Sequence, residues 1–82
     1  MKILVAEDDA EIGDYIRKGL VAEGHSVDHL TDGREALTYC LYNTCDLAIL
    51  DRMMPGMDGL ETATGIIAQT KRLPWMVLYS AM

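Results

Sequence analysis

The chain has 82 residues, enough for one small domain, and half of them are apolar, as is usual for a globular protein. Thirteen acidic and seven basic residues give a formal net charge of −6, with no run of Lys or Arg, so we expect no direct binding to nucleic acid. No export signal is visible, and no apolar stretch reaches the roughly 18 residues of a membrane span, so we expect a cytoplasmic protein without a membrane partner.

The first predicted unit is a strand followed by a helix. Residues 3–6 are a short apolar run that predicts the strand. Asp8 stands three residues before Glu11, which is the spacing of a capping box, so we expect Asp8 to begin the helix. Gly24 is expected to end this helix. Its apolar stripe consists of Ile12, Ile16 and Leu20.

The second unit repeats this pattern. Residues 26–30 predict a weaker strand with polar residues in its middle, which we place at an edge of the sheet. Asp32 and Glu35 have the same capping-box spacing and begin a second helix, which ends at Asn43. The predicted buried face of this helix consists of Ala36, Leu37, Cys40 and Leu41.

The third unit begins with residues 47–50, an apolar run between two aspartates that indicates a strand buried on both faces of a parallel sheet. The second aspartate, Asp51, is followed by a loop rich in Pro and Gly. Asp58 and Glu61 mark a third helix start, although Thr and Gly make the segment a poor helix former. We expect four of its residues to be buried: Leu60, Ala63, Ile66 and Ile67.

A fourth strand is predicted over residues 75–79, after Pro74. Strands that alternate with helices predict an α/β fold with a parallel sheet and right-handed connections. Cys40 and Cys45 lack the spacing of a zinc site, so we interpret them as reduced thiols.

Acidic residues follow two of the predicted strands. In a sheet of this kind the first and third strands are neighbours, so Glu7, Asp8 and Asp51 are expected to converge at the carboxyl edge, where ligand sites collect. Three adjacent carboxylates repel one another, and one of them holds a proton unless a cation intervenes. Mg²⁺ fits best, because it accepts one or two carboxylates, a carbonyl oxygen and several waters. Alternatively, Asp8 and Asp9 only cap the helix, Glu7 is solvated and Asp51 caps a loop.

Three segments, in this order and spacing, resemble the receiver domain of bacterial two-component response regulators, above all the subfamily in which it precedes a winged-helix DNA-binding domain. They are KILVAEDD at residues 2–9, DGREAL at residues 32–37 and DLAILDRMMPGMDG at residues 46–59. The resemblance is close over residues 1–60 and loose over residues 74–81. It implies a single truncated receiver domain over residues 1–82, with a flavodoxin-like sheet of order 2-1-3-4 that lacks the fifth strand and the last two helices.

The same resemblance implies a function and a site. Asp51 would accept a phosphoryl group from a phosphohistidine on a sensor histidine kinase, or from a small phosphodonor. Asp8 and Asp51 would bind Mg²⁺ directly, Glu7 through water, and Met53 through its backbone carbonyl oxygen. Ser80 falls where the family has a Thr or Ser that contacts the phosphoryl group and changes rotamer. The chain would then be a signalling module and not a turnover enzyme.

The chain departs from the family in lacking the Lys of the fifth strand, so we expect phosphorylation to be impaired. The fourth strand would also present an uncharged apolar edge, from which we expect self-association as a dimer. The alternative function is an interaction or oligomerisation module without phosphotransfer. An aspartyl phosphatase is disfavoured, because that chemistry uses a second Asp two residues after the nucleophile, where Met53 stands.

Overall fold

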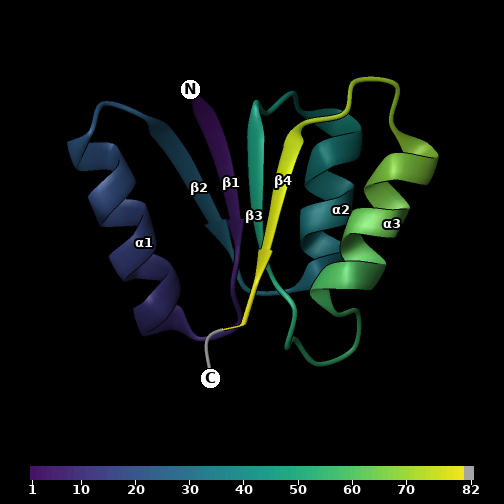
Figure 1. Ribbon diagram of the computed structural model, residues 1–82, viewed down its shortest axis with the longest axis horizontal. Coiled ribbons are helices and arrows are strands. Elements are labelled where there is room, and N and C mark those ends of the chain that lie inside the picture. The colour runs from purple at the N-terminus through teal and green to yellow at the C-terminus, as the bar shows by residue number, and fades with distance from the viewer. Residues whose placement is uncertain (81–82) are drawn as a thin grey trace.

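The computed structural model describes residues 1–80 and consists of one parallel sheet flanked by helices (Figure 1). In chain order the elements are β1 (Lys2–Ala6), α1 (Ala10–Ala22), β2 (Ser26–Leu30), α2 (Gly33–Tyr42), β3 (Leu47–Asp51), α3 (Gly59–Gln69) and β4 (Trp75–Tyr79). The four strands are parallel and lie in the order β2-β1-β3-β4, with α1 on one face of the sheet and α2 and α3 on the other. The predicted fold class and strand order are therefore confirmed.

The two faces of the sheet differ in how well they are covered. Side chains alternate along a strand, so every second residue faces α2 and α3. These residues and the two helices form the main core, in which Leu4, Ala6, Ala48 and Leu50 are fully buried. On the other face α1 packs on β1 and β2, while Trp75 and Val77 of the edge strand β4 are 83% and 48% exposed. The expected apolar edge is therefore present among the described residues.

The first helix begins one residue later than predicted. Its N-cap is Asp9, whose Oδ1 accepts hydrogen bonds from the backbone amides of Glu11 and Ile12 at 2.9 and 3.1 Å. The prediction that Asp8 begins this helix is wrong, because Asp8 lies outside the first turn and its side chain is exposed. At the other end Gly24 has a φ of 92° and its amide donates to the Val21 carbonyl, which confirms the predicted stop.

The other two helices start as predicted. Asp32 accepts a hydrogen bond from the Arg34 amide at 2.6 Å. Asp58 and Glu61 form a full capping box, in which each side chain accepts from the backbone amide of the other. Within residues 1–80, the helices are all too short or too polar to cross a membrane.

The buried face of α3 is only partly as predicted. Ala63 and Ile66 are buried, but Leu60 and Ile67 are each 55% exposed, and Thr62 is buried in their place. The hydroxyl of Thr62 donates to the Asp58 carbonyl at 2.7 Å, which satisfies its polar group and removes the main cost of burying it. The apolar residues of α3 therefore predicted a buried face that is rotated from the face that packs on α2. For the same reason Leu41 at the end of α2 is exposed, although Ala36 and Cys40 are buried.

Candidate functional site

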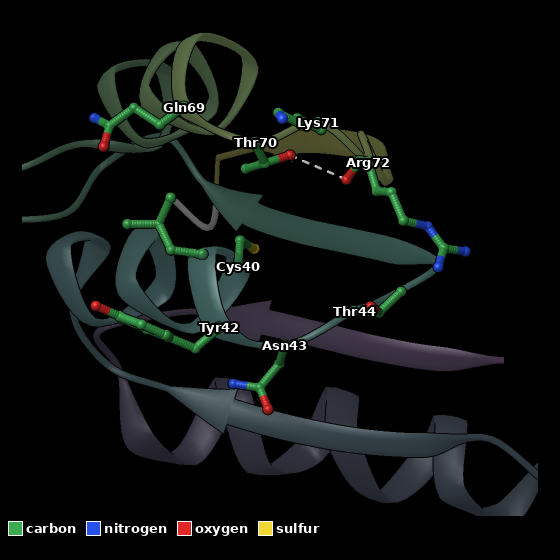
Figure 2. A pocket seen from close by; sticks show the side chains of 9 residues that line it. Cys40, Tyr42, Asn43, Thr44, Gln69, Thr70, Lys71 and Arg72 are labelled. Carbon is green, nitrogen blue, oxygen red and sulfur yellow. Dashed lines mark hydrogen bonds between the residues drawn. The ribbon is translucent and has the colours of Figure 1, made fainter.

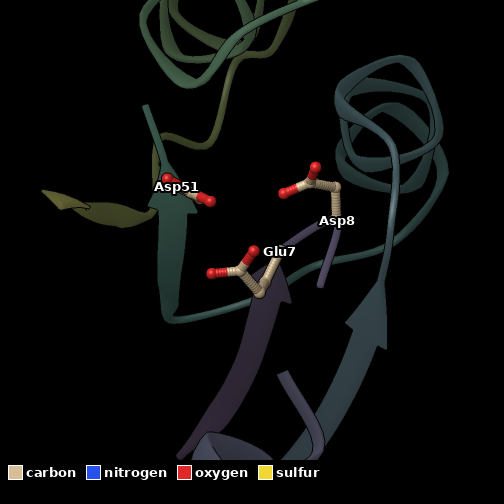
Figure 3. Close-up of side chains that lie close together, drawn as sticks. All are labelled: Glu7, Asp8 and Asp51. Carbon is tan, nitrogen blue, oxygen red and sulfur yellow. The ribbon is translucent and has the colours of Figure 1, made fainter. Parts of the chain in front are cut away.

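Three carboxylates meet where β1 and β3 end. Glu7 and Asp8 follow β1 and Asp51 ends β3, and these two strands are hydrogen-bonded neighbours. One carboxylate oxygen of each residue lies within 4.8 Å of those of the other two, and the side chains point toward one another (Figure 3). Glu7 and Asp51 are only 1% and 2% exposed, whereas Asp8 lies on the exposed rim. The fold therefore brings together the three acidic residues that the sequence singled out.

Glu7 is the most tightly held of the three. Its Oε1 accepts a hydrogen bond from the hydroxyl of Tyr79 at 2.5 Å, and its Oε2 accepts one from the Asp9 amide at 2.9 Å. His29 Nε2 donates to the backbone carbonyl of Glu7 at 2.9 Å. Burial raises the pKa of Glu7, and the neighbouring Asp51 adds to that rise. Glu7 is thus a fixed carboxylate whose negative charge is poorly compensated.

Asp51 is held by the turn that follows it. Its Oδ1 accepts a hydrogen bond from the Met53 amide at 3.0 Å, which restricts the rotamer of the Asp51 side chain. The Met53 side chain is exposed, which is compatible with a role for its backbone alone. On the far side of the turn, the Gly59 amide donates to the Arg52 carbonyl at 3.3 Å. The loop is therefore closed by its own backbone just beyond the acidic cluster.

Tyr79 is a site residue that the sequence reasoning missed. It is paired with Asp51 in the parallel register of β3 and β4, so both side chains leave the sheet on the same face. Burial and the hydrogen bond to Glu7 raise the pKa of Tyr79, so its hydroxyl is protonated and acts as a donor at neutral pH. No local pattern in the sequence could have found Tyr79, because its place beside Asp51 depends on the register of β4 on β3.

Ser80 is exposed and follows the last residue of β4. A contact between Ser80 and a phosphoryl group stays a prediction, and the register favours Tyr79 as the residue beside the carboxylates.

A hollow lies at the end of the sheet opposite the carboxylate cluster, between the C-terminal ends of α2 and α3 (Figure 2). It is lined by polar residues, among them Thr44, Lys71 and Arg72, and by the buried thiol of Cys40. The Thr70 hydroxyl donates to the Arg72 carbonyl at 3.0 Å and closes the turn beside it. None of the acidic site residues lines this hollow, so it is separate from the carboxylate cluster.

Comparison with known proteins gives a consistent result. The family model of the response regulator receiver domain matches residues 3–81. The chain is 38% identical over 78 residues to the response regulator MprA of Mycolicibacterium vanbaalenii, a match that covers 95% of this chain and 34% of MprA. The response regulator TrrA of Thermotoga maritima, solved in complex with Mg²⁺-BeF, has a TM-score of 0.90 at 36% identity, covering 99% of this chain and 70% of that one. TrrA solved in complex with the histidine kinase ThkA has a TM-score of 0.88, covering 98% and 68%.

The chain spans about a third of the length of the curated relatives that it matches. The family match nevertheless extends over nearly all of it, and the structural likeness extends over the whole parallel sheet. The chain therefore belongs to the response regulator receiver domains, the signalling modules of two-component systems.

Proposed function

We propose that this chain is a phosphorelay receiver that accepts a phosphoryl group on Asp51 in the presence of Mg²⁺. The observation that carries the proposal is the convergence of Glu7, Asp8 and Asp51, with their oxygens within 4.8 Å at the carboxyl edge of the sheet. Three carboxylates this close together repel one another, and a bound divalent cation would offset that repulsion.

The donor set suits Mg²⁺, which is a hard cation that prefers carboxylate, carbonyl and water oxygens. In this proposal Asp8 and Asp51 bind the ion directly and the Met53 carbonyl adds a further oxygen. Glu7 acts through water, which agrees with its two carboxylate oxygens already accepting hydrogen bonds from Tyr79 and Asp9. When bound, Mg²⁺ supplies positive charge to the phosphoryl oxygens.

Asp51 would act as the nucleophile. One of its carboxylate oxygens forms a bond to phosphorus while the bond between phosphorus and the leaving group of the donor breaks. The donor is a phosphohistidine of a sensor histidine kinase or a small phosphodonor. The turn that holds Asp51 through the Met53 amide restricts its side chain before the donor arrives, which lowers the entropic part of the barrier. The ThkA–TrrA complex supports the choice of a histidine kinase as partner.

A phosphorylation assay tests this proposal. The chain is incubated with Mg²⁺ and acetyl phosphate, and its intact mass is measured. We expect an adduct of one phosphoryl group that needs Mg²⁺ and disappears in Asp51→Asn. Asp46→Asn is the matched control, because Asp46 is an exposed aspartate immediately before the first residue of the same strand, far from the acidic cluster. An adduct that survives in Asp51→Asn, or no adduct on the wild type, would contradict the proposal.

We also propose that the chain self-associates through β4. The strand lies at the edge of the sheet, and its exposed Trp75 and Val77 continue an apolar face that α1 does not cover. Light scattering after size exclusion is expected to show a dimer for the wild type and a monomer for Val77→Lys. A wild type that stays monomeric at high concentration would exclude this mode of association.

The proposed setting is the cytoplasm, and the chain itself is not proposed to contact nucleic acid. The two cysteines are free thiols, as in a reducing compartment. The net charge of −6 opposes binding to a polyanion.

A further inference from the structure

The hydrogen bond between Tyr79 and Glu7 joins two strands that are not neighbours. Tyr79 ends the edge strand β4 and Glu7 follows β1, with β3 between them. The two residues are 72 positions apart in the sequence, and the hydroxyl of Tyr79 reaches across the end of β3 to Glu7 Oε1. The tyrosine side chain thus spans the same strand end that carries Asp51.

The backbone of Tyr79 is also held by a hydrogen bond. Its carbonyl accepts a hydrogen bond from the Arg52 amide at 2.7 Å, immediately after Asp51. The register pairs Tyr79 with Asp51 and directs both side chains to one face. Two separate hydrogen bonds therefore join Tyr79 to the acidic cluster. One links its backbone to Arg52 at the end of β3, and the other links its side chain to Glu7.

We propose that Tyr79 is a positioning residue for the proposed Mg²⁺ site, holding the Glu7 carboxylate in place beside Asp8 and Asp51 before the cation binds. The inference rests on the proposed function, because it concerns the same acidic site. In this role the Tyr79 hydroxyl on β4 prepares the site by acting on Glu7 and does not itself touch the ion.

The physical need for such a donor follows from the geometry. A Glu side chain has several rotamers, and repulsion from two neighbouring carboxylates favours those that turn away from them. Glu7 is buried, so it also loses the hydration that would otherwise stabilise its charge. A hydrogen bond from a hydroxyl to a carboxylate is charge-assisted and offsets both effects. Since a carboxylate offers about four lone-pair sites, the Tyr79 donor leaves others for a water of the metal shell.

Tyr79→Phe tests the inference, because it keeps the ring and removes only the hydroxyl. We expect its dissociation constant for Mg²⁺, measured by calorimetry, to rise roughly three- to tenfold, as for the loss of one hydrogen bond. Tyr39→Phe is the matched control: the Tyr39 hydroxyl also donates to a carboxylate, that of Asp28 at 2.7 Å, on the far edge strand. This control is expected to bind Mg²⁺ as the wild type does.

A second readout needs no metal. The side-chain carboxyl carbon of Glu7, observed by NMR in the Mg²⁺-free protein, is expected to shift in Tyr79→Phe and to stay unchanged in Tyr39→Phe. A double-mutant cycle completes the test: in a Glu7→Gln background Tyr79→Phe should have no further effect on Mg²⁺ affinity. A purely structural role for Tyr79 would instead lower affinity equally in both backgrounds.

The outcomes separate the two proposals. If the wild type binds Mg²⁺ and Tyr79→Phe binds it equally well, the positioning role of Tyr79 is overturned and the proposed function stands. If the wild type binds no Mg²⁺, the proposed site fails and the inference fails with it.

Discussion

Gly59, the first residue of α3, lies directly against the backbone of Asp51. A Cβ on Gly59 would overlap the Asp51 carbonyl oxygen and crowd the Cα of Arg52. The helix start therefore packs on the strand end that carries the proposed phosphate acceptor, and only a residue without a side chain allows this approach.

Gly59→Ala is expected to destabilise the protein by about 1–3 kcal/mol, because backbone atoms on both sides must move to admit the methyl group. It should also slow phosphorylation of Asp51, since the turn that holds this residue is displaced. Urea unfolding measures the first effect and intact mass the second. Gly19→Ala is the matched control on α1: nothing lies within 4 Å of its added Cβ, so stability should rise by up to about 1 kcal/mol. Equal effects of the two substitutions would contradict the packing described here.

Asp8 and Asp9 are adjacent but are expected to have separate roles. Asp9→Ala removes the N-cap of α1 and should cost about 0.5–2 kcal/mol of stability. It leaves Mg²⁺ affinity nearly unchanged, because the hydrogen bond to Glu7 comes from the Asp9 backbone. Asp8→Ala should abolish Mg²⁺ binding with a change in stability of no more than about 0.5 kcal/mol. Thermal unfolding and calorimetry on both variants check this, and a reversed pattern would refute the assignment.

Glu7 is expected to make the Mg²⁺-free protein less stable as pH rises. Burial raises the pKa of Glu7 above its ordinary value of 4.5, so the folded state holds the proton more tightly than the unfolded state. Its contribution to stability is therefore fully present below that ordinary value and is lost as pH rises through the raised pKa. Glu7→Gln has no such dependence and should be the more stable protein at neutral pH without metal.

With Mg²⁺ present, the wild type should become more stable than Glu7→Gln. A ligand adds the most stability to the protein that binds it most tightly. Urea unfolding of wild type and Glu7→Gln over a pH series, with a chelator and then with Mg²⁺, measures both effects. A stability difference that is independent of pH would show that Glu7 is not the group responsible.

Cys40 and Cys45 are expected to resist alkylation while the protein is folded. Both side chains are buried. The neighbouring Cys45 thiol and burial raise the pKa of Cys40, whereas Cys40 lowers the pKa of Cys45, so burial is the protection that the two thiols share. Iodoacetamide labelling followed by mass spectrometry should be slow in buffer and fast in urea. Rapid labelling of both thiols in buffer would mean that the ends of α2 and β3 open readily.

Local patterns in the sequence were sufficient for the order of the elements and for the acidic cluster. Apolar runs and aspartates at helix starts are short-range signals, so alternating strands and helices could be read directly. A parallel sheet then places Glu7 and Asp51 at one edge, because adjacent parallel strands end on the same side.

Tertiary structure decided the contacts that depend on packing and register. Periodicity could not show that Thr62 replaces Leu60 on the buried face of α3, because the nearest neighbours on α2 come from a distant part of the chain. Nor could it show that the Tyr79 hydroxyl reaches Glu7, since that contact requires the register of β4 on β3 as well as the position of β1. A shift of one residue in that register would send Tyr79 to the other face of the sheet, and only the folded chain determines which residue stands beside the carboxylates.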